Sequence, residues 1–178
     1  MYVTWDATNL YLGMTGTDLA NGDMVVYFDI KENNGWTDGD TRGEAGKVAH
    51  GLPFPANYAF WAESGADSPN DGDATRTYAL RGLGFQGWSD TPCAGMDAYL
   101  DSTVNDVSEV KIPWTCLGNP LGEVRIATII EAESTGSVLA VHPTQTIDSG
   151  SVQQNFTEFL QFTPQLQGDL SDGTLTSF

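Results

Sequence analysis

Hydrophobic and polar residues alternate one by one through much of this chain, in short segments separated by Gly, Asn, Asp and Pro. A period of two indicates β-strands with one buried face, whereas the helical period of 3.6 is scarce here. The pattern predicts strands near Met1–Trp5, Leu10–Thr15, Met24–Ile30, Tyr58–Glu63, Thr75–Arg81, Ala98–Asp101, Val107–Pro113, Glu123–Glu133, Val138–His142 and Glu158–Phe162. We therefore predict an all-β fold, an antiparallel β-sandwich of the jelly-roll or immunoglobulin-like kind.

Two segments indicate which residues face the core. Val110 and Ile112 fall on the side opposite Glu109 and Lys111. The later segment repeats the pattern, with Val124, Ile126, Thr128 and Ile130 opposite Arg125 and Glu131. Each strand is therefore predicted to have one buried and one solvent-exposed face.

Two connections carry local signals. Asp6–Asn9 lies between two apolar segments and predicts a tight hairpin, because Asp and Asn bond to their own backbone and tolerate left-handed geometry. Pro113–Leu117 predicts a single helical turn, closed by Gly118. At most one or two such turns are expected.

The chain has 178 residues, enough for one well-filled core. We predict a single sandwich domain over residues 1–165, followed by a polar segment, 166–178, that forms a tail or a last strand. The sequence is strand-like from Tyr2 onward. We therefore expect it to be part of a larger multidomain protein.

Charge excludes some partners. Asp and Glu number 24 against 7 Lys and Arg, for a formal charge of -17. Such a field repels phosphate backbones and anionic lipids, so nucleic acid is not expected as a partner. The sequence contains no run of 18 apolar residues, and membrane insertion is not expected either.

Asp residues gather in turn-rich stretches that suit hard cations. Asp38 and Asp40, with Gly43, resemble the opening of a calcium loop. Arg42 and Ala49 stand where an EF-hand has ligands, so the segment is not an EF-hand.

A second acidic cluster contains Asp71 and Asp73, and Asp29 ends an apolar strand before the first cluster. Because calcium accepts six to eight oxygens in irregular geometry, two loops can share one ion. We predict structural calcium bound by Asp29, Asp38, Asp40, Asp71 and Asp73. The alternative is a set of solvated acidic turns, with Asp29 capping the turn after its strand.

Catalytic chemistry has little support. His50 and His142 are the only histidines, and neither lies in a nucleophile, metalloprotease or phosphate-binding motif. Both are expected to make structural contacts in a loop or at a strand end. We therefore expect this protein not to be an enzyme.

Three of the five tryptophans are candidates for sugar stacking. Trp36 and Trp88 lie in segments rich in Asn, Gln, Asp and Gly, where an indole ring can stack on a sugar while polar neighbours bind its hydroxyls. The alternative is that both rings plug the open end of a sandwich. Trp61 faces either a second core layer or an exposed sheet face.

Cys93 and Cys116 lie 23 positions apart, without a CxxC motif or a nearby His. Zinc binding is therefore not expected. The two cysteines either form a disulfide, which would indicate an oxidising compartment, or remain reduced thiols.

The order of segments is similar to that of the family-nine carbohydrate-binding modules and their DOMON-like relatives. The glucodextranase C-terminal domain type is the nearest of these. The residues that carry the resemblance are Tyr2–Gly13, Gly22–Asp29, Ala49–Phe54, Tyr58–Ala62, Val110–Gly118 and Glu123–Ala127. The resemblance implies an extracellular or cell-surface β-sandwich, often with bound calcium, that binds glycans between tryptophans without cleaving them.

These observations predict a non-catalytic carbohydrate-binding module of a secreted or cell-surface polysaccharide-processing protein. Its partner would be a polysaccharide or oligosaccharide, bound by Trp36, Trp61 and Trp88. The alternative is a structural adhesion or surface-layer anchoring domain that acts through protein contacts.

Overall fold

Strands form nearly all the regular structure of the described chain. The computed structural model describes residues 1–15, 22–30, 34–41, 47–62, 78–84, 87–100, 107–120, 122–132, 135–148, 153–164 and 176–177. The strands are β1 (Tyr2–Trp5), β2 (Asn9–Thr15), β3 (Gly22–Asp29), β4 (Trp36–Asp38), β5 (Gly51–Ala56), β6 (Tyr58–Ala62), β7 (Tyr78–Gly84), β8 (Gly87–Asp90), β9 (Asp97–Tyr99), β10 (Val107–Pro113), β11 (Val124–Ala132), β12 (Val138–His142), β13 (Leu160–Phe162) and β14 (Thr176–Ser177). One 3-10 turn, η1 (Trp114–Leu117), follows β10.

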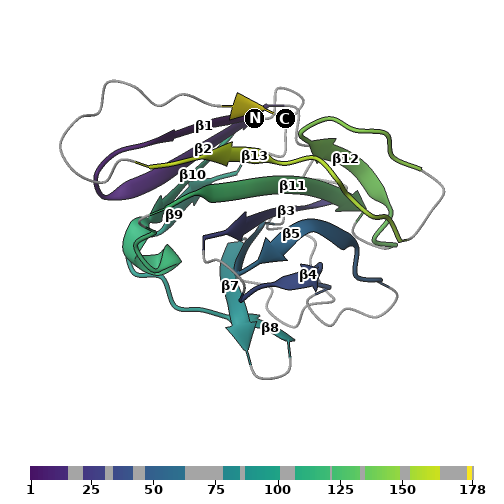
Figure 1. Cartoon of the computed structure of the whole chain (residues 1–178), viewed down its shortest axis with the longest axis horizontal. Coiled ribbons are helices and arrows are strands. Elements are labelled where there is room, and N and C mark those ends of the chain that lie inside the picture. The colour runs from purple at the N-terminus through teal and green to yellow at the C-terminus, as the bar shows by residue number, and fades with distance from the viewer. Residues whose placement is uncertain are drawn as a thin grey trace.

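Two antiparallel sheets form the sandwich (Figure 1). The smaller has the order β1-β2-β10-β9. The larger has the order β14-β13-β11-β3-β6-β7-β8, and β12 also pairs with β11. Side chains of both sheets join in one hydrophobic core, for example Leu12 and Ile112 from the small sheet with Val26, Phe60 and Ile126 from the large one. The predicted all-β sandwich is confirmed.

Local predictions hold at both connections. β1 pairs with β2, and the Asp6 carboxylate accepts the backbone N–H groups of Thr8 and Asn9, each at 2.7 Å. The predicted helical turn is η1, and it ends at Gly118, whose φ of 77° is left-handed. Glycine adopts that conformation without the clash that a Cβ would cause.

The prediction of one buried and one solvent-exposed face per strand is confirmed for β10 and wrong for β11. Ala127, Ile129 and Glu131 lie on the face of β11 that points away from the main core, yet all three are buried. They belong to a second hydrophobic cluster or border it, because β5 and the segment around Phe156 cover this face of the large sheet. The large sheet is therefore buried on both sides near its centre.

Several strands escaped prediction. β5 contains two prolines, which normally argue against a strand, and it pairs with the three-residue β4 in a small separate sheet. β8 was also missed, and it has only four residues. In the segment 166–178, predicted as a tail or a last strand, Thr176 and Ser177 form β14, which pairs with β13. Parts of the predicted strands at 63, 75–77, 101 and 133 lie outside the described residues.

Of the two alternatives for the cysteines, the structure contains the disulfide. Cys93 and Cys116 are bridged, with their Cα atoms 5.3 Å apart. The bridge ties the segment before β9 to η1, beside the main core. Among the described residues, no helix is long and apolar enough to cross a membrane.

Candidate functional site

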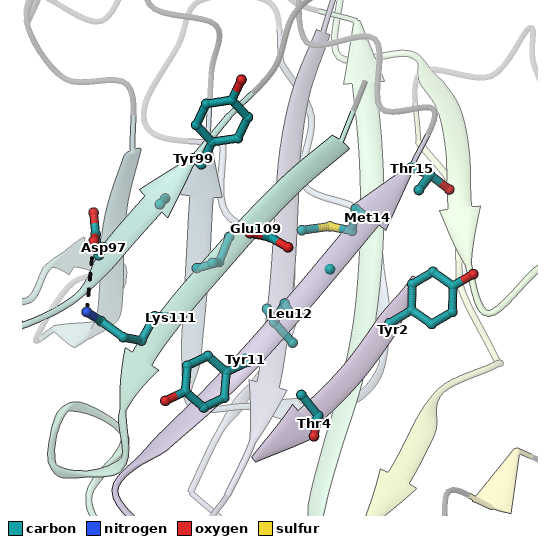
Figure 2. Close-up of a pocket in the computed structure, with 13 residues that line it drawn as sticks. Tyr2, Thr4, Tyr11, Leu12, Met14, Thr15, Asp97, Tyr99, Glu109 and Lys111 are labelled. Atoms are coloured by element: carbon teal, nitrogen blue, oxygen red, sulfur yellow. Dashed lines mark ion pairs between the residues drawn. The ribbon is translucent and has the colours of Figure 1, made fainter. Parts of the chain in front are cut away.

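A groove of about 920 Å³ lies on the outer face of the four-stranded sheet. Its lining comes from β1, β2, β9 and β10, the same strands whose inner faces build the main core (Figure 2). Since side chains alternate between the faces of a strand, the outward residues are set by the same period that buries Leu12 and Val110.

Strand register arranges these outward residues in two rows. In the first row, Tyr2 pairs with Gly13, Gly13 with Glu109, and Glu109 with Tyr99. The second row, two residues along each strand, contains Thr4, Tyr11, Lys111 and Asp97. Side chains paired across antiparallel strands share one face, so both rows line the groove.

Gly13 leaves a hollow in the first row. A Cβ at this position would meet only the Cβ and Cδ2 atoms of Tyr2, at 3.7 and 3.9 Å. Tyr2 and Tyr99 flank the row and are 71% and 64% exposed. They lie three strands apart, which corresponds to about 14 Å at the usual strand spacing. Figure 2 shows the rings of Tyr2, Tyr11 and Tyr99 around this central region.

Tyr11 is held in place by the hairpin. Its hydroxyl donates to the Asp6 carboxylate at 2.7 Å and accepts from the side-chain amide of Asn9 at 3.2 Å. The hydrogen bond to Asp6 raises the pKa of Tyr11. The pKa of Asp6 is strongly lowered, first by the backbone N–H of Thr8 and then by the Tyr11 hydroxyl. The ring is thus fixed by an ionised partner before any ligand arrives.

Charged groups complete the groove. Lys111 lies 3.8 Å from Asp97, and the Glu109 carboxylate is exposed between Gly13 and Tyr99 in register. The groove therefore offers aromatic faces next to carboxylate, ammonium and hydroxyl groups. This combination suits ligands with alternating apolar and hydroxylated surfaces.

Trp61, predicted to stack on sugar, is a core residue. Its side chain is 0% exposed, in the second hydrophobic cluster with Val25, Leu52 and Ala127. Of the two orientations open from the sequence, the structure shows the second core layer. No ligand can reach this ring in the folded protein, so Trp61 is removed from the candidate site.

Trp36 and Trp88 come together at another edge of the protein. The Trp36 ring is 39% exposed and lies 3.7 Å from the Cβ position of Gly87. Trp88 is half-buried: its indole N–H donates to the Asp38 carbonyl at 3.1 Å, and its ring meets Tyr27 edge-on. The pair lies on β4 and β8, outside the sheet that forms the groove.

Two of the predicted calcium ligands, Asp29 and Asp40, contact arginines. Asp29 pairs with Arg125 at 3.3 Å, and Asp40 contacts Arg81, which also binds Asp90. Each of these carboxylates is thus opposed by an arginine, which sequence proximity could not show. In the described part of the chain, no three His, Cys, Asp or Glu side chains gather in a metal-binding arrangement.

The remaining predicted ligands add little to this picture. Asp38 is exposed on β4, and its carbonyl is used by Trp88. Asp71 and Asp73 lie outside the described residues. Calcium binding by the acidic loops stays a prediction.

A buried group of charges was missed by sequence reasoning. Lys47, Asp23 and Glu131 meet in the second core layer, where His50 also contacts Glu131 at 3.2 Å. His50 accepts the backbone N–H of Gln154, in keeping with its predicted structural role. A signal was available, because Glu131 shares its strand face with Ala127 and Ile129, which are apolar.

The comparisons with known proteins add no assignment. No protein-family model, no curated protein and no solved structure matches the chain. The resemblance to family-nine modules therefore stays a prediction, and the functional interpretation depends on the geometry described above.

Proposed function

We propose that this protein is a non-catalytic carbohydrate-binding module that holds an oligosaccharide or a polysaccharide segment in the groove of its four-stranded sheet. The observation that carries the proposal is the set of tyrosines, Tyr2, Tyr11 and Tyr99, around the Gly13 hollow on a solvent-exposed sheet face. Exposed aromatic side chains that line one groove with polar groups between them are typical of a binding surface, whereas singly scattered ones are not.

The groove fits the chemistry of sugars. A pyranose ring has apolar C–H faces that stack on aromatic rings and hydroxyl groups at its rim that need hydrogen-bond partners. Glu109 and Asp97 supply acceptors, and Lys111 supplies donors, between the aromatic rings. The separation of about 14 Å between the outer tyrosines corresponds to three strand spacings and matches a short oligosaccharide.

Binding also benefits from preorganisation. Tyr11 is fixed by Asp6 and Asn9, and all four strands are anchored by the main core beneath them. A rigid site loses little side-chain entropy when a ligand binds. The disulfide supports an oxidising location, so we place the module in a secreted or cell-surface polysaccharide-processing protein. Calcium would act on the acidic loops rather than in the groove.

A glycan screen tests the proposal directly. The purified protein is screened against neutral, acidic and amino polysaccharides, with millimolar calcium and again with a chelator. Binding of one glycan class is expected in both conditions. Loss of binding with the chelator would locate calcium within or beneath the site.

Variants identify the surface that binds. Tyr2→Ala and Tyr99→Ala should weaken glycan binding at least tenfold, because each removes a stacking ring, whereas Tyr99→Phe should retain most of it. Trp36→Ala is the matched control, since Trp36 is also exposed but lies on β4. If Trp36→Ala abolishes binding and the tyrosine variants do not, the site is the tryptophan edge. A folded protein that binds no glycan would favour the adhesion or anchoring function.

A further inference from the structure

Three complementary side chains meet in the second core layer, far from solvent. Lys47 lies just before β5, Asp23 near the start of β3, and Glu131 near the end of β11. Their side chains are 2%, 0% and 4% exposed. Asp23 and Glu131 are direct register partners across β3 and β11, so the sheet itself fixes the two carboxylates side by side.

The Lys47 nitrogen lies close to both carboxyl groups. The ammonium nitrogen of Lys47 touches Oδ2 of Asp23 and lies 3.5 Å from Oε1 of Glu131. The same nitrogen lies 4.8 Å from the ring centroid of Trp61, which closes one side of the site. The arrangement sets an amine nitrogen against one carboxyl group, with a second carboxyl group 3.5 Å from the same nitrogen and opposite Asp23 in register.

His50 fixes the protonation of this group. Its Nδ1 accepts the backbone N–H of Gln154 at 3.3 Å, so the ring proton is on Nε2, which faces Oε2 of Glu131 at 3.2 Å. The imidazole is therefore neutral, and one Glu131 oxygen contacts His50 while the other is turned to Lys47. A neutral imidazole leaves Lys47 as the cation that faces both carboxylates.

Burial makes this ion pair reactive. Charges in a low-dielectric interior are costly, and transfer of one proton from Lys47 to Asp23 turns the pair into a neutral amine and a carboxylic acid. An amine fixed against a carboxyl carbon reacts with a large effective concentration, because no orientation has to be found. We propose that Lys47 and Asp23 join through an intramolecular isopeptide bond, with Glu131 as the catalytic residue.

The reaction balances without a cofactor. After the proton transfer, the Lys47 nitrogen attacks Cγ of Asp23 and forms the C–N bond. The Glu131 carboxylate takes a proton from that nitrogen and delivers it to the departing hydroxyl group. The C–O bond breaks, one water leaves, and Glu131 returns to its carboxylate form. The product is one amide in place of one ammonium and one carboxylate.

The bond would fasten the second layer to the large sheet. It links β3, in the centre of that sheet, to the segment that leads directly into β5. β5 belongs to a separate small sheet and packs over the large one through the second hydrophobic cluster, with backbone hydrogen bonds between Gly51 and the segment around Asn155. The inference is independent of glycan binding in the groove, which lies on the other sheet.

Intact-mass spectrometry of the denatured wild-type protein tests the bond. The expected mass is about 18 Da below that of the sequence with its disulfide, the loss of one water. Tryptic digestion should give a branched peptide that joins residues 1–31 to residues 43–76, because an acylated Lys47 is not cleaved. A wild-type protein at the unmodified mass, with a normal cleavage after Lys47, would overturn the proposal.

Two controls distinguish formation of the bond from the catalytic role of Glu131. Lys111 lies 3.8 Å from Asp97 at an exposed position, and this pair should stay unlinked in the same digest. Glu131→Gln keeps the size of the side chain and should leave Lys47 and Asp23 unlinked at the full mass. If Glu131→Gln still loses water, the bond stands and the catalytic role of Glu131 is overturned.

Discussion

Replacement of Gly13 by Val should make the protein more stable and its groove less able to bind. Gly13 has extended strand geometry, and a Cβ there meets only Tyr2, at ordinary contact distances of 3.7 and 3.9 Å. Glycine inside a strand costs about 0.5–1 kcal/mol relative to Ala, and Val is among the best strand residues. We expect a gain of about 1 kcal/mol and a rise in Tm of about 2–4 °C.

The effect on binding has the opposite sign. The valine side chain would fill the hollow between Tyr2 and Glu109 and lift a bound sugar ring from the sheet. Loss of that contact should weaken binding at least tenfold, which corresponds to about 1.4 kcal/mol. Because stability and affinity change in opposite directions, a loss of folding cannot imitate the expected result.

Two measurements and one control decide this prediction. Calorimetric unfolding gives Tm, and titration with the best glycan from the screen gives the affinity. Gly122→Val is the control, since nothing lies within 4 Å of a Cβ at Gly122 and this residue is outside the groove. A lower Tm for Gly13→Val would refute the claim that the groove has room for a side chain at residue 13. An unchanged affinity would refute the proposal that the glycan binds over Gly13.

Two further changes test the core and the hairpin. Trp61→Ala removes a fully buried ring and should lower the free energy of unfolding by about 3–5 kcal/mol in denaturant titrations, whereas Trp36→Ala should change it little; similar losses for both would contradict the assignment of Trp61 to the core. Asp6→Asn should lower Tm at pH 7, because folding depresses the pKa of Asp6 and the ionised form is the one that is stabilised. That stability is present above the unfolded pKa of about 3.9 and is lost as the pH falls towards the lower folded value, so the difference in Tm should narrow below about pH 4. A difference that stays constant down to pH 2 would show that the carboxylate charge is not its source.

The strand pattern could be predicted because it is local. Alternation alone placed the buried residues Val110 and Ile112 of β10 correctly, and turn chemistry placed the Asp6 hairpin and the turn before Gly118. β5 was missed because its prolines argue against a strand. The second core layer was left open as one of two alternatives for Trp61, and the outer face of β11 was wrongly predicted to be exposed, since only a cover such as β5 buries it.

The candidate site could not be predicted in the same way, because its residues come together only through the register of strands that are distant in sequence. Tyr2, Gly13, Tyr99 and Glu109 form one row only when β1, β2, β10 and β9 are aligned. In the sequence, a tyrosine at an outward strand position looks like an ordinary surface residue. The same limit applied to Asp29, whose neighbour Arg125 is 96 positions away.

The pairing of β3 with β11 sets the order in which this protein can fold. β11 is the central partner of β3 along eight consecutive residue pairs, and the residues between them in sequence include β4 to β10. During synthesis, β3 can first pair only with β6, and its other edge stays open until residue 132 has emerged. An apolar strand with a free edge invites pairing with other chains. Because most native contacts must wait for distant partners, we expect slow folding that is sensitive to protein concentration.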